Sequence, residues 1–304
     1  MKAAVIGIGS NSVRMLIAET GEGGIRRLAR DREGTRLFAG LDERGNLSEE
    51  SMEKTAAAVA RMAESARQSG VEELHIFATS ASRDARNGEV FIRRIRERSG
   101  CDLEIISGEE EAELSFLGAS AAVRGSGLIG VIDIGGGSTE IVTGDSRHVV
   151  SAISCQMGAV RLYNLLQITG REDMTAAEAA ATLVLEDKLK EHPLPAKPAC
   201  WVGTGGTFTT MAAMTKKIPW TDRTNMHGTV VSEAEIRLIG GDLADMTPEE
   251  RLELPGLQPS RADIVVHGVC ILLAVMKKLE IPTIIVSEFG NLDGYMRKKY
   301  EQPV

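Results

Sequence analysis

Hydrophobic residues in this chain group into short runs separated by glycines and polar turns, with longer amphipathic stretches between them. The apolar runs at 2–8, 13–20 and 25–38 predict three successive strands. A stretch with helical periodicity at 48–69 follows, and a short buried strand is expected at 75–79. Strands followed by amphipathic helices indicate an α/β fold.

A second group of apolar runs is organised around residues 130–142. One run ends at Ile134, three glycines follow at 135–137, and another run begins at Thr139. This pattern predicts a strand, a tight turn and a returning strand. Successive glycines allow close approach of the backbone to a ligand and aim several N–H groups at an anion such as phosphate. Asp133 and Glu140 flank the turn, where they can hold a cation or a water.

The first and second groups are related by an internal repeat. Residues 5–14 align with residues 131–140, and Val5, Ile6, Ile8, Gly9 and Ser12 recur identically in the second copy. In this alignment, Gly7 occupies the position of Asp133, and Arg14 occupies the position of Glu140. We therefore expect two related α/β domains, each beginning with a hairpin, that together grip a phosphate chain across a cleft.

Composition narrows the class of protein. The 304 residues suffice for two domains with substantial cores, and the net charge of −8 argues against general attraction to nucleic acid or membrane surfaces. The four cysteines contain no CxxC pair, as expected of reduced thiols in a cytosolic protein. No basic leader and no apolar run of about 18 residues is present, so we expect a cytoplasmic protein.

Two polar segments follow predicted strands in the first half. Arg83 lies just after the strand at 75–79, where α/β folds place ligands, and is interpreted either as a phosphate ligand or as a surface arginine. Ser107 and Glu110 suit a helix N-terminus, but three glutamates stand at 109–111. One of them is either a further cap residue or a general base for water.

The second half contains a further glycine-rich turn and a long apolar helix. Gly205 and Gly206 lie in a Gly-Thr-Gly-Gly-Thr turn that opens a helix, a plausible phosphate contact. A helix is expected from Ser260 to Leu279, with Arg261 in its first turn facing the cleft. His267 within this helix is interpreted as a core histidine with satisfied hydrogen bonds.

Six segments together resemble the exopolyphosphatase/guanosine pentaphosphate phosphohydrolase (Ppx/GppA) family of the actin–sugar kinase–Hsp70 superfamily. In chain order they are GIGSNSVR (7–14), ATSASRDARNG (78–88), ISGEEEAELSF (106–116), VIDIGGGSTEIV (131–142), GTGGT (203–207) and RADIVVHG (261–268). The resemblance implies two ribonuclease-H-like (actin-like ATPase) domains with an interdomain cleft. The domains are expected at 1–124, with a boundary near 123–127, and at 125–289. A C-terminal helix, about 290–304, is expected to pack back on the first domain.

The resemblance also implies roles for individual residues. Glu111, with Glu110 as the adjacent alternative, matches the catalytic glutamate of the family, and Asp133 and Glu140 match its carboxylates for Mg²⁺ or another divalent cation and for water. Arg14, Arg83 and Arg261 match its phosphate-gripping arginines. The turns expected to contact phosphate contain Gly9, Ser10, Asn11, Ser12, Gly135, Gly136, Gly137, Ser138, Thr139, Gly205 and Gly206.

The expected activity is hydrolysis of the terminal phosphate of inorganic polyphosphate. The alternatives are a guanosine pentaphosphate 5′-phosphohydrolase, a non-catalytic polyphosphate or alarmone sensor, and, less favoured, a kinase. No nucleic-acid or membrane partner is expected, and a homodimer is compatible with the sequence. Two departures from the family pattern are Gly7 in place of the usual aspartate, and Ser287–Gly294 in place of Ser-Asp-Tyr-Gly-Leu-Arg-Glu-Gly, without its arginine.

Overall fold

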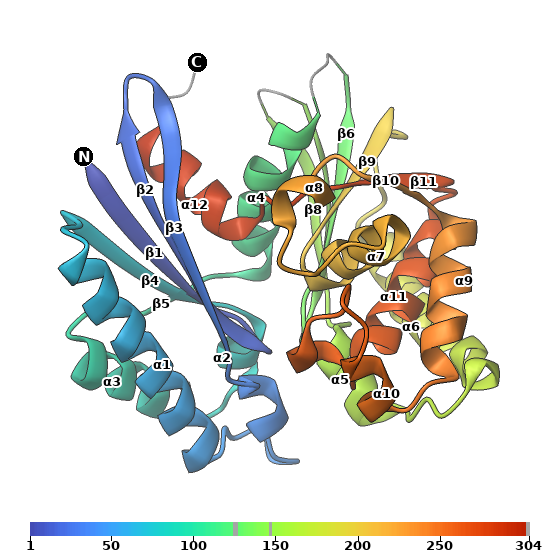
Figure 1. Ribbon diagram of the computed structural model, residues 1–304, viewed down its shortest axis with the longest axis horizontal. Helices are drawn as coiled ribbons and strands as arrows, with labels where there is room; N and C mark the ends of the chain where they lie inside the picture. Colours follow the sequence, from blue (N-terminus) through green and yellow to red (C-terminus); the bar gives the residue numbers. More distant parts are fainter. Residues whose placement is uncertain (124–126, 146–147, 302–304) are drawn as a thin grey trace. The chain divides into compact units, whose positions relative to one another are not determined.

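A computed structural model of the chain describes residues 1–123, 127–145 and 148–301 (Figure 1). The chain forms two compact units. The N-terminal unit comprises Met1–Gly118 together with Asn291–Val304, and the C-terminal unit comprises Ala119–Gly290. The expected boundary near 123–127 falls partly on 124–126, outside the described residues, and the predicted domain limits stay a prediction.

The N-terminal unit is built on a five-stranded sheet. Its elements are β1 (Lys2–Ile8), β2 (Ser12–Gly21), β3 (Gly24–Gly34), η1 (Leu37–Gly40), α1 (Glu49–Gln68), β4 (Glu73–Ala78), α2 (Ser80–Asp84), α3 (Gly88–Ser99), β5 (Glu104–Ile105), α4 (Gly108–Ala119) and α12 (Asn291–Tyr300). The strand order is β3-β2-β1-β4-β5; β3–β2 and β2–β1 pair in antiparallel fashion, whereas β1–β4 and β4–β5 pair in parallel. Ser48 caps α1 by accepting a hydrogen bond from the Ser51 amide, as its sequence position predicts.

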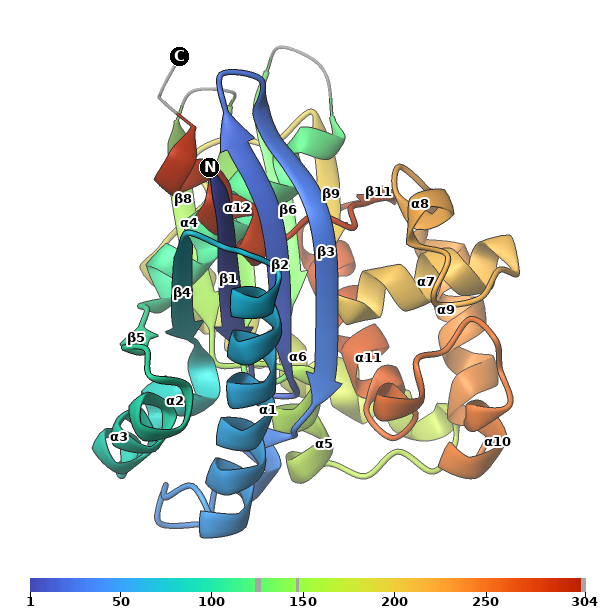
Figure 2. The same cartoon turned by 60° about the vertical axis from the view of Figure 1, so that its left-hand side comes forward.

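Helix α12 completes the N-terminal unit from the far end of the chain. Figure 2 shows α1 and α12 on opposite faces of the sheet. Leu292 and Met296 of α12 join Val5, Leu16 and other residues of the strands in one buried cluster. A Cβ on Gly294 would lie 1.8 Å from the Leu114 carbonyl oxygen, so only glycine allows α12 to cross α4 this closely.

The C-terminal unit repeats this plan with one additional strand. Its elements are η2 (Ser120–Ala122), β6 (Ile129–Ile134), β7 (Thr139–Gly144), β8 (Val149–Cys155), α5 (Ala159–Leu165), η3 (Arg171–Asp173), α6 (Met174–Glu191), β9 (Cys200–Thr204), α7 (Gly206–Lys216), α8 (Arg223–Met226), β10 (Val230–Ser232), α9 (Glu233–Ala244), α10 (Pro248–Leu252), η4 (Pro259–Arg261), α11 (Val265–Lys278) and β11 (Thr283–Val286). Its strand order, β8-β7-β6-β9-β11, matches that of the first sheet, and β10 extends the edge. The predicted α/β class with two related ribonuclease-H-like domains is confirmed.

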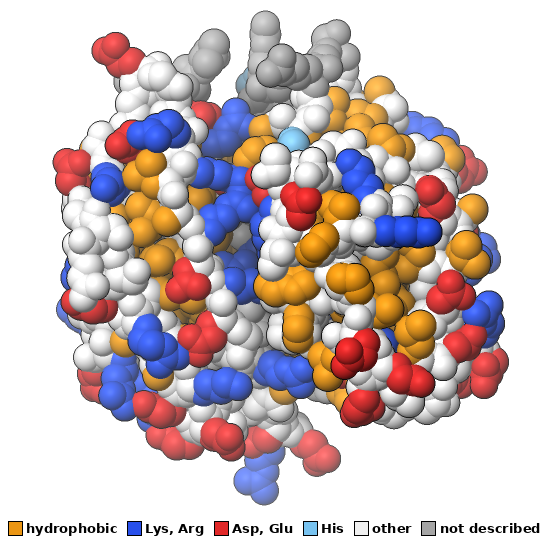
Figure 3. All heavy atoms as spheres, in the orientation of Figure 1, with side chains coloured by type: hydrophobic (Ala, Val, Ile, Leu, Met, Phe, Trp, Pro, Cys, Tyr) orange, Lys and Arg blue, Asp and Glu red, His pale blue; other side chains and the backbone are white. Residues whose placement is uncertain are grey.

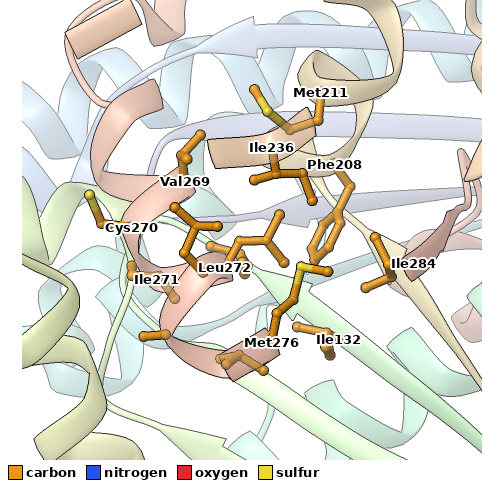
Figure 4. Packing of buried hydrophobic residues seen from close by; sticks show 14 of the residues in the cluster. Ile132, Phe208, Met211, Ile236, Val269, Cys270, Ile271, Leu272, Met276 and Ile284 are labelled. Atoms are coloured by element: carbon orange, nitrogen blue, oxygen red, sulfur yellow. The ribbon is translucent and has the colours of Figure 1, made fainter. Parts of the chain in front are cut away.

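Helix α11 lies in the core of the C-terminal unit. Its residues from Val265 to Met276 are all buried, as the apolar run predicts. Val269, Leu272 and Met276 pack with Phe208 of α7 and Ile132 of β6 (Figure 4). His267 is buried in this helix, as expected of a core histidine, and its Nε2 is hydrogen-bonded to the Leu166 carbonyl at 2.9 Å. Its Nδ1 has no hydrogen-bond partner among the described residues, so only one of the two ring nitrogens is satisfied.

Two predicted elements differ from the structure at their ends. The strand expected at 25–38 ends at Gly34, because Arg36 adopts a left-handed conformation (φ 53°) and Leu37 and Phe38 enter a 3₁₀ turn. The helix expected from Ser260 begins at Val265 instead, because Pro259–Arg261 form a separate 3₁₀ turn. Within the described residues, none of the helices is sufficiently long and apolar to cross a membrane.

Candidate active site

The two hairpins of the repeat close with the same turn. The Gly9 amide donates to the Ser12 carbonyl at 3.0 Å, and the Gly135 amide donates to the Ser138 carbonyl at the same distance. At both glycines, a Cβ would meet this serine carbonyl at 3.3 and 3.2 Å respectively. These contacts are tighter than most Cβ contacts, so the turn favours glycine at the position that opens each copy of the motif.

The carbonyl groups of the Gly135–Ser138 turn are held from one side. The Gly135 and Gly136 carbonyls accept hydrogen bonds from the first amides of α5, and the Gly137 carbonyl accepts one from Arg161 Nε at 2.8 Å. In a trans peptide the N–H points opposite to the C=O. The amides of Gly136, Gly137 and Ser138 therefore all point away from α5, in the arrangement that binds anions.

The Gly9–Ser12 turn is supported in the same way. The Ser10 carbonyl accepts from the Phe38 amide at 2.9 Å, and the Asn11 carbonyl accepts from the Arg36 amide at 3.1 Å. The amides of Asn11 and Ser12 therefore point away from η1. In both units the segment that follows the third strand orients the turn, so the duplication extends to the supporting hydrogen bonds.

Asp133 and Glu140 lie directly opposite each other on β6 and β7. Because partnered residues of antiparallel strands point to the same face, their side chains are neighbours. Both are buried, and Glu140 accepts a hydrogen bond from Ser154 Oγ of β8 at 2.8 Å. The structure therefore brings together the two carboxylates that the sequence assigned to a cation.

The Gly-Thr-Gly-Gly-Thr turn lies against this carboxylate pair. Gly205 has φ +94°, and a Cβ on it would lie 2.8 Å from Asp133 Oδ1. Both the backbone conformation and the close approach of the carboxylate therefore require glycine there. Thr204 of β9 pairs with Asp133 of the adjacent parallel strand β6. The Thr204 hydroxyl donates a hydrogen bond to the Phe289 carbonyl at 2.8 Å.

Arg261 covers Gly206, the third glycine of this turn. A Cβ on Gly206 would lie 2.1 Å from Arg261 Nη1, and Nη2 donates to Thr207 Oγ1 at 3.2 Å. Arg261 is only 5% exposed, and its neighbour Ala262 is held through its carbonyl by Arg251 Nη1 at 2.8 Å. A buried cation is thus fixed at the N-terminus of α7, where it can bind a phosphate oxygen.

In the N-terminal unit, Arg83 and Glu111 form an ion pair at 3.3 Å. Arg83, in the last turn of α2, also donates to the Ile106 carbonyl at 2.9 Å, immediately before α4. Glu111 is 6% exposed, whereas Glu110 contacts Lys298 of α12 at 3.2 Å. The adjacent glutamates therefore face different partners, and Glu111 is the one beside a candidate phosphate ligand.

Two other candidates have structural partners. Arg14 donates to Asn291 Oδ1 at 3.0 Å, which joins β2 to the first turn of α12. The Thr139 hydroxyl donates to the Met157 carbonyl and not to the glycine turn. The sequence reasoning missed Arg161, Ser154, Thr207 and Arg251, each of which holds a candidate residue or its turn. Thr207 closes the Gly-Thr-Gly-Gly-Thr turn, whereas Arg161, Ser154 and Arg251 belong to no motif that distinguishes them in a single sequence.

Comparison with known proteins decides the family. A sequence profile described as the Ppx/GppA phosphatase family matches residues 16–301. The chain belongs to the Ppx/GppA phosphatase family. This confirms the resemblance drawn from its motifs.

Individual Ppx/GppA relatives match over nearly their full length. The protein is 33% identical over 310 residues to exopolyphosphatase 2 of Mycobacterium tuberculosis, covering 96% of this chain and 97% of the relative. Among solved structures, an exopolyphosphatase-like protein matches with a TM-score of 0.89 and 29% identity, over 98% of this chain and 100% of that one. An exopolyphosphatase from Cytophaga hutchinsonii matches with a TM-score of 0.88 and 26% identity, over 99% and 98%.

Proposed function

We propose that this protein is an exopolyphosphatase that hydrolyses the terminal phosphate of inorganic polyphosphate with the help of a divalent cation. The observation that carries the proposal is the pairing of Asp133 with Glu140 beside the glycine turn at 135–137. Similarity to proteins named exopolyphosphatases over nearly their full length supports the choice of substrate.

The carboxylate pair suits Mg²⁺. No group of three or more His, Cys, Asp or Glu side chains placed to hold a metal occurs among the residues described. Mg²⁺ is usually held by only one or two carboxylates, together with waters and substrate phosphates. Asp133 and Glu140 would hold it here, and the bound cation would offset charge on the phosphate being transferred.

The phosphate itself would be held by neutral and positive groups of the C-terminal unit. The amides of Gly136, Gly137 and Ser138 form one side of this set, and Arg261 at Gly206 supplies the cation. Phosphoryl transfer depends mainly on such positioning and charge stabilisation and requires little covalent participation of the protein.

Glu111 is proposed as the general base. It would accept the proton of the attacking water, while Arg83, 3.3 Å away, fixes the orientation of its carboxylate. The water oxygen forms the new bond to the terminal phosphorus, and the bond to the bridging oxygen breaks. Orthophosphate leaves, and the shortened chain carries away the bridging oxygen.

The test compares phosphate release from long-chain polyphosphate and from guanosine pentaphosphate, each with Mg²⁺ and with EDTA. We expect release from polyphosphate that requires the metal. Asp133→Asn should lower this release by about 10²-fold or more, because an unmatched charge then develops in the transition state. The matched control is Asp187→Asn, which removes the negative charge of an exposed ion pair between Asp187 and Lys190 on α6.

A second readout separates metal binding from chemistry. Binding of Mn²⁺, followed by electron paramagnetic resonance, should weaken in Asp133→Asn and not in Asp187→Asn. Release from guanosine pentaphosphate alone would favour the nucleotide phosphohydrolase. Binding of polyphosphate without cleavage of either substrate would favour the sensor, and both outcomes would overturn the proposal.

A further inference from the structure

One segment of the C-terminal unit, residues 154–161, contacts both parts of its candidate site. The segment comprises the end of β8, the connection at 156–158 and the first residues of α5. Ser154 Oγ donates to Glu140 Oε1 at 2.8 Å, and Arg161 Nε donates to the Gly137 carbonyl at 2.8 Å. We call residues 154–161 the supporting segment, because they hold one carboxylate of the pair and the glycine turn.

Ser154 belongs to a row of polar residues that crosses four adjacent strands. Thr204 of β9 pairs with Asp133 of β6, and Asp133 pairs with Glu140 of β7. Glu140 in turn pairs with Ser154 of β8. Paired residues point to the same face of a sheet, so a hydroxyl group flanks the two carboxylates on either side. The Thr204 hydroxyl donates to the Phe289 carbonyl, whereas the Ser154 hydroxyl donates to a carboxylate.

The carboxylates of this row are buried. Figure 3 shows many Asp and Glu side chains at the surface of the molecule, whereas Asp133 is 8% exposed and Glu140 only 1%. A carboxylate buried this deeply is stable only with hydrogen-bond donors or a cation beside it. Donors that orient a metal-binding carboxylate change metal affinity by about 10–100-fold when they are removed. Ser154 therefore has the position of a residue that tunes cation binding through Glu140.

Arg161 holds two consecutive carbonyl groups of the glycine turn. Its backbone amide donates to the Gly136 carbonyl at 3.0 Å, and its Nε donates to the Gly137 carbonyl. Its Nη2 donates to Gln156 Oε1 at 2.7 Å, which fixes the guanidinium within the supporting segment. Glycine leaves the backbone its largest conformational freedom, so the direction of the peptide group after Gly137 depends on such a contact. By holding the carbonyl, Arg161 points the Ser138 amide to the opposite side, where an anion can bind.

The first copy of the repeat is supported by different contacts. Arg14, the counterpart of Glu140, pairs with Arg32 of β3. The carbonyl of Asn11, the counterpart of Gly137, accepts a hydrogen bond from a backbone amide at 3.1 Å. Because the same hairpin forms there on other contacts, its folding does not require a serine or an arginine side chain at these positions. A role in the site explains their presence in the second copy.

We propose that Ser154 and Arg161 are positioning residues with separate tasks. Ser154 orients Glu140 for the divalent cation, and Arg161 orients the peptide group between Gly137 and Ser138 for the phosphate. The inference rests on the proposed function and adds to it the residues that hold the cation ligand and the phosphate-binding turn. Each of the two residues acts through the group that it holds.

The experiment uses the full chain and the variants Ser154→Ala and Arg161→Met. In Ser154→Ala, the Kd for Mn²⁺, followed by electron paramagnetic resonance, should rise by about tenfold or more. The affinity of this variant for long-chain polyphosphate in EDTA should stay as in the wild type. In Arg161→Met, the affinity for polyphosphate in EDTA should fall by about tenfold, while the Kd for Mn²⁺ should stay unchanged.

Three further variants separate these effects from general changes. Ser154→Thr keeps a hydroxyl group on a residue suited to a strand and should restore the affinity for Mn²⁺. Ser151→Ala removes a hydroxyl from the same strand, at a position paired with Thr143, and should leave both affinities unchanged. Arg171→Met removes the same charge from an exposed ion pair with Asp245 and should not weaken polyphosphate binding as Arg161→Met does.

Turnover gives a second readout. Excess Mg²⁺ should restore the rate of Ser154→Ala, whereas excess polyphosphate should restore that of Arg161→Met. If the wild type binds Mn²⁺ and polyphosphate but hydrolyses neither polyphosphate nor guanosine pentaphosphate, the proposed function fails while the two binding comparisons still decide this inference. Equal loss of both ligands in each variant would indicate structural support alone. That result, or affinities unchanged in both variants, would overturn the inference.

Discussion

In the N-terminal unit, the side chain of Leu292 packs against Gly7 and occupies the space that a side chain at position 7 would need. A Cβ on Gly7 would lie 2.8 Å from Leu292 Cδ2 and 3.2 Å from the Phe77 ring. These two residues stand at the two departures from the family pattern, where the usual residues are an aspartate and an arginine. In this chain, the position that corresponds to Asp133 in the repeat is thus filled by apolar packing from α12.

This contact predicts that substitutions at Gly7 and Leu292 have non-additive effects on the free energy of unfolding. Gly7→Asp should lower the free energy of unfolding by about 3 kcal/mol, because it places a carboxylate among apolar groups. Leu292→Arg should cost a similar amount, and the double variant should recover at least about 1 kcal/mol of their sum. Urea denaturation measures the cycle. Pairing Gly7→Asp with Leu238→Arg, which changes an exposed leucine of α9, should give simple additivity.

The different surroundings of Glu110 and Glu111 predict different effects on turnover. Glu111→Gln should reduce polyphosphate hydrolysis by about 10²–10⁴-fold, because the amide accepts no proton from water. Binding of polyphosphate in EDTA should be largely retained. Glu110→Gln loses only a partly exposed ion pair with Lys298 and should change the rate little. A larger loss for Glu110→Gln than for Glu111→Gln would reverse the assignment.

The close packing of Arg261 on Gly206 predicts that Gly206→Ala impairs binding of substrate. The added methyl group would lie 2.1 Å from Arg261 Nη1, so the guanidinium must move away from the N-terminus of α7. We expect KM for polyphosphate to rise by about tenfold, the effect of one lost charge-assisted hydrogen bond. Gly23→Ala, where no atom lies within 4 Å of the new Cβ, is the matched control. An unchanged KM would exclude Arg261 from the phosphate site.

His267 predicts a loss of stability in acid. Burial lowers the pKa of His267, whereas the hydrogen bond to the Leu166 carbonyl raises it and the positive charge of Arg251 lowers it further. The folded state therefore binds fewer protons than the unfolded state, whose imidazole titrates near pH 6.5. The contribution of His267 to the unfolding free energy is full above this pH and decreases as the pH falls.

Between pH 7 and pH 5 this loss amounts to up to about 2 kcal/mol. His267→Gln should flatten the pH dependence of denaturant unfolding by that amount. His192→Gln, at an exposed position after α6, should leave the dependence as it is. If both variants retain the wild-type slope, the acid sensitivity arises elsewhere in the chain.

Much of the fold and part of the site follow from the sequence. A four-residue turn between two apolar runs determines that Asp133 faces Glu140, because the register of a hairpin is set by its turn. The internal repeat predicts that the second sheet has the same strand order as the first. These features depend on local pattern, which a single sequence displays.

Other parts of the site depend on tertiary packing. Successive helical residues point in directions about 100° apart, so the run Glu109–Glu111 alone does not tell which carboxylate meets Arg83. The answer depends on α12, because Lys298 of this helix forms an ion pair with Glu110. The start of α11 was placed too early for a similar reason, since the 3₁₀ turn at Pro259–Arg261 is fixed by Arg251 and the Ala262 carbonyl.

The separation of α12 from the rest of its unit in the sequence determines an order of folding during synthesis. The C-terminal unit is continuous, from Ala119 to Gly290, and has all its strands once Val286 has left the ribosome. The N-terminal unit is made first but lacks Leu292 and Met296 of its core until α12 emerges. The half of the protein that is translated first is therefore the half that is finished last.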